Sequence, residues 1–292
     1  MKTPITCLTR TIQAPGATLT YDVRPGSSSS EPPLFLIGSP MGASGFTTLA
    51  SHFPDRTIIT YDPRGAERST KDDPATASNP EMHADDLHRI IQEVGGPVDL
   101  FASSGGAVNA LALVAKHPED VRTLIAHEPP IAAILPDAEN AKAAVRAISD
   151  SYQRGGFGAG MAHFMTITSH RGPFPADIAS QPAPDPSAFG MPAEDDGTRT
   201  DVMLAQNIVG TTHYEPDFDA LSRASTRIVV AAGSESQGEM ANRGAYAVAE
   251  RLGTETVVFP SHHGGFLGGE YGWGGEPEAF AAKLRQVLEQ AA

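Results

Sequence analysis

Short apolar runs alternate with amphipathic stretches along most of the chain. The apolar runs span four to six residues and are typical of strands covered on both faces of a sheet. The amphipathic stretches place apolar residues on one helical face, as Leu87, Ile90 and Ile91 do. Strands are predicted at residues 9–13, 18–23, 34–37, 56–61, 98–101, 121–126, 227–231 and 254–259. Helices are predicted at residues 80–94, 107–117, 238–252 and 277–290. This alternation predicts an α/β fold with a mostly parallel, doubly wound sheet after an N-terminal hairpin.

The alternation is interrupted between residues 131 and 220. Helices are predicted there near residues 139–154, 158–168 and 201–209, with no clear strand. Residues 171–192 hold six prolines, which indicate an irregular excursion. We therefore predict an α/β core formed by residues 1–130 and 221–292, with a helical cap subdomain over residues 131–220.

The charge of the chain bears on its partners. Acidic residues outnumber basic ones by 35 to 21, for a formal net charge of −14. This charge opposes binding to nucleic acid or to an anionic membrane. No window approaches the roughly 18 apolar residues of a membrane span. We expect a soluble protein with a small-molecule substrate, no nucleic-acid partner and no membrane partner; a homo-oligomer is compatible with the sequence.

Residues 1–26 lack an apolar segment behind a basic start, so we expect a cytoplasmic location. The single cysteine, Cys7, excludes an intrachain disulfide and a cysteine-rich zinc site. The ten histidines include no His-Glu-x-x-His pattern. The sequence therefore predicts neither a metal centre nor a cofactor.

Ser104 is the candidate nucleophile. It follows the predicted strand at residues 98–101 and precedes the predicted helix at 107–117, in the run Ala102-Ser103-Ser104-Gly105-Gly106. A serine on such a sharp turn needs small residues two positions before and after it, and Ala102 and Gly106 satisfy this requirement. The pattern is a nucleophile elbow with Ala in place of the first Gly.

A serine hydroxyl needs a base, which is usually an imidazole oriented by a carboxylate. Two adjacent histidines follow the last predicted strand, and we choose His263 because the glycines after it make a loop that can bring the ring over the serine. His262 is interpreted as an ordinary loop histidine. Two acids fit the order Ser, acid, His: Glu128 and Glu235. Glu128 is preferred because its apolar strand and two following prolines indicate a buried carboxylate that requires a partner.

The oxyanion hole needs two backbone N–H groups. Gly105, the residue after the nucleophile, supplies one. The other is expected from the loop after the strand at residues 34–37, where Ser39 is our choice because Pro40 has no N–H. Met41 is the alternative.

These motifs together resemble the α/β-hydrolase superfamily, over essentially the whole chain outside the cap. Residues 36–40 are similar to its oxyanion loop, 61–65 to its strand-four turn, 102–106 to its elbow and 263–266 to its histidine loop. Ala102 and Ile37 depart from the commoner Gly and His. The pairs Ser103-Ser104 and His127-Glu128 are similar to the zearalenone-type lactonases. That narrower resemblance implies Glu128 as the acid and a lactone or bulky apolar ester as substrate.

The expected function is a serine hydrolase that cleaves a carboxylic ester or lactone. Its catalytic residues would be Ser104, Glu128 and His263, with Ser39 and Gly105 in the oxyanion hole. Two alternatives remain open: a non-catalytic small-molecule-binding protein on the same fold, and a cofactor-free haloperoxidase-like enzyme that uses the same triad.

Overall fold

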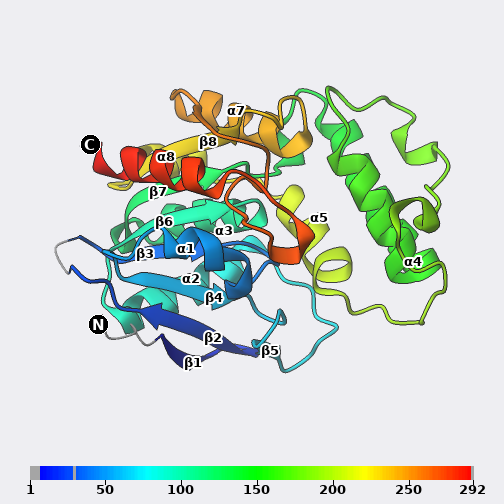
Figure 1. The fold of residues 1–292 in the computed structure, drawn as a ribbon. Helices are drawn as coiled ribbons and strands as arrows, with labels where there is room; N and C mark the ends of the chain where they lie inside the picture. Colours follow the sequence, from blue (N-terminus) through cyan, green and yellow to red (C-terminus); the bar gives the residue numbers. More distant parts are fainter. Residues whose placement is uncertain (1–6, 29–30, 291–292) are drawn as a thin grey trace.

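The computed structural model describes residues 7–28 and 31–290, and within them a nine-stranded sheet forms the centre of the molecule (Figure 1). Residues 1–6, the start of the segment searched for a leader, lie outside this part. The strands are β1 (Leu8–Ala14), β2 (Ala17–Arg24), β3 (Leu34–Ile37), β4 (Ile58–Asp62), β5 (Thr70–Lys71), β6 (Val98–Ser103), β7 (Val121–His127), β8 (Arg227–Gly233) and β9 (Val257–Phe259). Their order is β1-β2-β4-β3-β6-β7-β8-β9, with β5 beside β2.

The sheet is antiparallel at one edge and parallel elsewhere. β2 pairs antiparallel with β1, β4 and β5. From β4 through β9 every pairing is parallel. The predicted fold class is therefore confirmed, and the strand ends that carry Ser104 and Glu128 leave the sheet at the same edge, because Ser103 of β6 pairs with His127 of β7.

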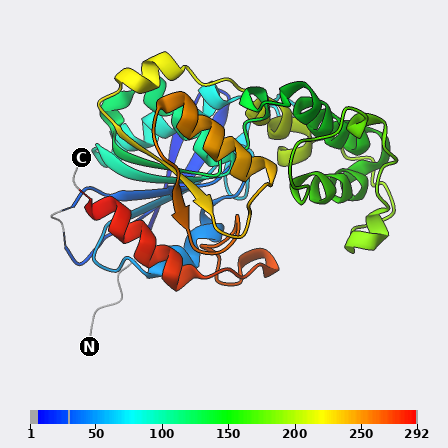
Figure 2. The ribbon, with the colours of Figure 1, turned by 90° about the horizontal axis from the view of Figure 1, so that it is seen from above.

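Helices cover both faces of the sheet (Figure 2). One face packs against α1 (Thr47–Ser51) and α8 (Pro277–Glu289) through Leu49, Phe280 and Leu284. The other face packs against α2 (Pro80–Val94), α3 (Gly105–Lys116) and α7 (Met240–Leu252). Further short helices are η1 (Ala43–Phe46), η2 (Pro118–Asp120), η3 (Ala132–Ile134), η4 (Ile178–Ser180), η5 (Pro186–Phe189), η7 (Glu270–Gly272) and α6 (Phe218–Arg223).

The ends of α2 follow the signals in the sequence. The Asn79 side chain accepts a hydrogen bond of 2.8 Å from the Met82 N–H, and Pro80 occupies the first turn. Gly95 ends the helix at φ 83°, a conformation that costs glycine little. The predicted boundaries of this helix are confirmed.

The segment between β7 and β8 forms a helical lobe beside the sheet, green to yellow-green in Figures 1 and 2. It contains α4 (Ala138–Thr168), a π-helix η6 (Val202–Asn207) and α5 (Ile208–Thr212). Gly156 interrupts α4 at φ 75°, so the two helices predicted near residues 139–154 and 158–168 meet at a kink. Val145, Ile148, Tyr152 and Leu204 give the lobe an apolar core of its own. The division into core and cap at residues 131 and 220 stays a prediction.

Some details differ from the sequence prediction. β5 was not expected, because a two-residue strand leaves no periodicity to detect. β9 begins at Val257 rather than at residue 254, since Thr254 instead closes the C-terminal turn of α7 through its N–H to Ala249 O. No helix in the described part of the chain is long and apolar enough to cross a membrane.

Candidate active site

Ser104 occupies the single position between β6 and α3. Its backbone has φ 58° and ψ −129°, a conformation that an L-residue adopts at a cost. The Ser104 N–H donates to His127 O at 2.9 Å, and the Ala107 N–H donates to Ser104 O at 2.9 Å. Hydrogen bonds to the neighbouring strand and to the first turn of α3 thus hold this residue on the sharp turn that the sequence predicts.

The two glycines after Ser104 allow the loop after β3 to approach. A Cβ atom at position 106 would lie 2.9 Å from the Gly38 Cα, and one at position 105 would lie 2.6 Å from Ser39 O. Both distances are too short for a side chain, so glycine is required. The structure therefore brings Gly105 beside the buried Ser39. Whether Ser39 or Met41 gives the second oxyanion N–H stays a prediction.

Glu128 and His263 form a hydrogen-bonded pair. His263 Nδ1 lies 2.6 Å from Glu128 Oε2. Glu128 directly follows β7, at φ 49°, and its side chain is fully buried. His263 lies in the loop after β9, and 37% of its side chain is exposed. Because Nδ1 is engaged by the carboxylate, Nε2 is the nitrogen left to act as a base.

The second carboxylate oxygen of Glu128 is held from β8 and α7. Glu128 Oε1 accepts hydrogen bonds from the Gly233 N–H at 2.8 Å, from Asn242 Nδ2 at 3.3 Å and from the Ser236 hydroxyl. Sequence reasoning missed these donors. The signal available was the position of Ser236 in the turn after β8, where many such sites carry their acid. In this protein the turn instead donates a hydrogen bond to Glu128, the acid that follows β7.

The pKa of Glu128 is lowered and that of His263 is raised from their ordinary values. Burial alone would raise the pKa of Glu128, but the hydrogen bond and charge of His263 and the Ser236 hydroxyl outweigh it, so that pKa lies well below its usual range. Burial lowers the pKa of His263, yet the hydrogen bond to Glu128 and the charges of Glu128 and Glu239 raise it overall. An ionised Glu128 thus favours the imidazolium form of His263.

The other candidates of the sequence lie elsewhere. Glu235 is exposed, and its Oε2 accepts only a long hydrogen bond of 3.4 Å from the Ser261 hydroxyl. His262 Nε2 lies 3.1 Å from Gly274 O, and His262 Nδ1 accepts from the Gly264 N–H at 3.1 Å. Both His262 nitrogens therefore organise the loop. The structure brings Glu128, and not Glu235, to His263.

A second imidazole is buried behind the pair. The His127 ring lies 6.0 Å from the His263 ring, centroid to centroid, and its Nδ1 lies 3.1 Å from Ser103 Oγ. Phe101, Phe259, Phe266 and Phe280 surround it. Burial and the charge of His263 lower the pKa of His127 to about 4, although the charge of Glu128 raises it. The His127 imidazole is therefore neutral at pH 7.

The comparisons with known proteins agree with this architecture. Residues 32–177 match the family described as alpha/beta hydrolase fold. An uncharacterized hydrolase of Bacillus subtilis, YraK, is 31% identical over 263 residues, which cover 88% of this chain and 89% of that protein. The chain belongs to the α/β-hydrolase fold family. The resemblance inferred from the motifs is thereby confirmed, whereas the narrower likeness to zearalenone-type lactonases stays a prediction.

Solved α/β-hydrolase structures share the fold over nearly the whole chain. A thermophilic esterase from Thermogutta terrifontis is 18% identical with a TM-score of 0.66, covering 97% of this chain and 98% of the esterase. A proline iminopeptidase of Mycobacterium smegmatis is 18% identical with a TM-score of 0.63, covering 97% and 98%. At this identity the likeness establishes the fold alone, and neighbours named for different reactions share it.

Proposed function

We propose that this α/β-hydrolase is a serine hydrolase that cleaves a carboxylic ester or lactone of a small, partly apolar molecule through an acyl-enzyme. The observation that carries the proposal is the 2.6 Å hydrogen bond between buried Glu128 and partly exposed His263. It lies at the sheet edge where Ser104 is held at φ 58°. A nucleophile on a strained turn, an imidazole and an orienting carboxylate are the groups that acyl transfer requires.

In the first half of the reaction Ser104 Oγ attacks the acyl carbon, and its proton passes to His263 Nε2. Glu128 stabilises the imidazolium that forms and keeps the ring oriented. The N–H groups of Gly105 and Ser39 donate to the oxyanion of the tetrahedral intermediate. The C–O bond to the alcohol then breaks, and the leaving oxygen takes the proton from His263.

In the second half a water molecule attacks the acyl-enzyme. His263 Nε2 accepts the proton of this water, a second oxyanion forms in the same place, and its collapse breaks the bond to Ser104 Oγ. That oxygen takes back the proton, the carboxylic acid leaves and the enzyme is restored. For a lactone, the alcohol and the acid are two ends of one product.

The surroundings of Gly105 and the charge of the chain favour a neutral, partly apolar substrate. A Cβ atom at position 105 would lie 3.4 Å from the Thr211 methyl group, so α5 of the lobe reaches the start of α3. The Met41 side chain packs against Gly38, in the loop after β3, and against Gly45 of η1. With a net charge of −14, the protein repels anionic substrates at long range. The structural neighbour from Thermogutta is itself described as an esterase.

The test is fluorophosphonate labelling combined with hydrolysis of a panel of p-nitrophenyl esters and aryl lactones. The wild type should be labelled once, on Ser104, and should turn over at least one class of ester. Ser104→Ala should lose both the label and roughly 10³–10⁶-fold in kcat, as removal of a triad nucleophile does.

Ser103→Ala is the matched control, because it removes the adjacent hydroxyl and leaves Ser104 in place. It should still be labelled. A folded wild type that is neither labelled nor active on any ester would contradict the proposal and favour a non-catalytic binding protein. A protein that is labelled but hydrolyses no ester would contradict the proposed ester substrate. The proposal of an activated Ser104 would still hold.

A further inference from the structure

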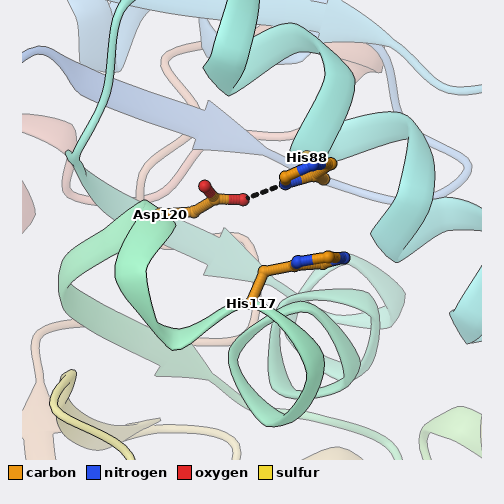
Figure 3. Close-up of side chains that lie close together, drawn as sticks. All are labelled: His88, His117 and Asp120. Carbon is orange, nitrogen blue, oxygen red and sulfur yellow. Dashed lines mark hydrogen bonds and ion pairs between the residues drawn. The ribbon is translucent and has the colours of Figure 1, made fainter.

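Two histidines and an aspartate meet where the end of α3 lies beside α2, away from Ser104 (Figure 3). His88 lies on α2, His117 directly follows α3, and Asp120 ends η2. The two imidazole rings stack with centroids 3.9 Å apart and an angle of 14° between their planes. His88 Nδ1 lies 2.6 Å from Asp120 Oδ2. One donor atom from each of the three residues lies within 4.8 Å of the other two.

The Asp120 carboxylate is fixed in this position. Its side chain is only 1% exposed, and Oδ1 accepts a hydrogen bond of 2.8 Å from Gln92 Nε2, one turn after His88 on α2. A buried carboxylate is retained where partners compensate it, and here α2 supplies both of them. The side chains of His88 and His117 are 30% and 21% exposed, so the cluster is open to ions from solvent on the ring side.

We propose that His88, His117 and Asp120 bind a zinc ion. Two imidazole nitrogens and one carboxylate oxygen form a donor set that suits Zn²⁺, with water in the fourth position of a tetrahedron. Donors about 2.0–2.2 Å from the metal lie about 3.3 Å apart in that geometry. The present separations, from 2.6 Å to at most 4.8 Å, bracket this value. To close the site the two stacked rings must turn, so that a nitrogen lone pair of each, which lies in the ring plane, points at the ion.

The ion would stabilise the fold and take no part in the chemistry at Ser104. α3 begins beside Ser104 and ends beside His117, and its 12 residues separate the two by about 18 Å. A zinc ion on the cluster would join α2 to the connection between α3 and β7. A search for short metal-binding motifs does not find this cluster. His117 and Asp120 follow His88 by 29 and 32 positions, and the three residues meet only because α2 packs on α3.

The experiment uses full-length protein without a histidine tag, stripped of metal by a chelator and then dialysed. Isothermal titration with ZnCl₂ should give one high-affinity site per chain, and zinc should raise the thermal unfolding temperature, because it binds the folded state preferentially. His88→Ala and His117→Ala should each weaken the affinity by at least about tenfold and reduce the thermal shift. Asp85→Asn is the matched control: Asp85 is a half-exposed acid of α2 that pairs with Lys116, and its replacement should leave both readouts unchanged.

A second measurement does not depend on the variants. Co²⁺ added to wild-type protein should give the intense visible absorption of a four-coordinate site, and Zn²⁺ should abolish it. Absence of a zinc site in the wild type, a cobalt spectrum typical of hexaaqua ion, or undiminished affinity in both histidine variants would each overturn the proposal. Ester hydrolysis and labelling at Ser104 test a different part of the molecule, so either proposal can fail alone.

Discussion

His263 Nδ1 lies 2.6 Å from Glu128 Oε2, although 135 positions separate the two residues in the chain. Two separate connections meet here: the turn after β7 and the loop after β9. Three donors fix the other oxygen of the carboxylate, so Glu128 can accept from His263 only along one direction. The fold thus presets both the orientation of the imidazole and the tautomer that would leave Nε2 free to act as a base.

Replacement of the acid should impair hydrolysis while sparing the fold. In Glu128→Gln the neutral side chain cannot stabilise an imidazolium, and its amide group disturbs the tautomer of His263. We expect kcat/KM for an ester to fall by about 10³–10⁴-fold. Glu235→Gln should stay within about threefold of wild type, because Glu235 is exposed and its side chain accepts a long hydrogen bond from Ser261. Circular dichroism of both variants would check folding, and the opposite ranking of the two glutamates would refute the assignment.

The pH dependence of activity should change when Glu239, a second carboxylate that acts on His263, is replaced. The charge of Glu239 raises the pKa of His263, and Glu239 is itself paired with Arg171 at 3.2 Å. The base must be neutral, so kcat/KM should rise with pH through the pKa of His263, above 6.5. Glu239→Gln removes a negative charge that raises the pKa of His263, so this pKa falls. The rising limb should therefore move to lower pH.

The measurement is kcat/KM against pH at low ionic strength, where charges separated by solvent are least screened. Relative to wild type, Glu239→Gln should perform better at about pH 6 than at about pH 8. Glu235→Gln serves as the control and should retain the wild-type profile, since it differs by the same charge a few residues away. A profile of Glu239→Gln that coincides with wild type, or moves to higher pH, would show that Glu239 does not act on His263.

Local features made much of the fold and part of the site predictable. The strand, the turn and the helix around Ser104 are encoded in about twenty consecutive positions, where apolar residues and small residues alternate in the order that the geometry requires. Asn79 and Gly95 similarly mark both ends of α2 by local hydrogen bonds and backbone preference. The buried setting of Glu128 followed from its apolar strand and the prolines after it.

The rest depends on contacts that no local pattern contains. Ser236 and Asn242 reach Glu128 only because α7 packs over the end of β8, and the sequence shows them as ordinary polar residues. His88 and Asp120 meet only because α2 lies against α3. The partners of a side chain are set by packing between elements, whereas the elements themselves are set largely by their own residues.

Backbone strain at Ser104 should be measurable as a difference in the free energy of unfolding between two variants of this residue. Ser104 has φ 58° and ψ −129°, which is the mirror image of a common extended conformation and therefore easy for glycine but costly for alanine. Relief of such strain is worth about 1–3 kcal/mol, while glycine loses up to about 1 kcal/mol through the entropy of the unfolded chain. Ser104→Gly should thus be more stable than Ser104→Ala by about 1 kcal/mol. Urea unfolding of the two inactive variants measures this difference, and a less stable glycine variant would mean that the turn is unstrained.

Acid should destabilise the protein through its buried histidines. The pKa values of His127 and His83 are lowered to about 4 by burial, against about 6.5 in the unfolded chain. Between those values the unfolded state binds a proton that the folded state does not, so stability is complete above pH 6.5 and falls as the pH drops toward 4. At about 1.4 kcal/mol for each pH unit, each histidine contributes about 3 kcal/mol to the loss.

His127→Leu removes one of these titrations and keeps an apolar side chain among the phenylalanines around position 127. Its absolute stability at neutral pH will differ from wild type because the contact with Ser103 is lost. The informative quantity is the difference in unfolding free energy between about pH 7 and about pH 5, which should shrink by about 2 kcal/mol relative to wild type. His52→Leu, at a half-buried histidine after α1, is the control for the exchange of a histidine for leucine. An equal pH dependence in wild type and His127→Leu would mean that His127 is protonated with little penalty in the folded protein, and the aromatic surroundings would then have to admit the charge.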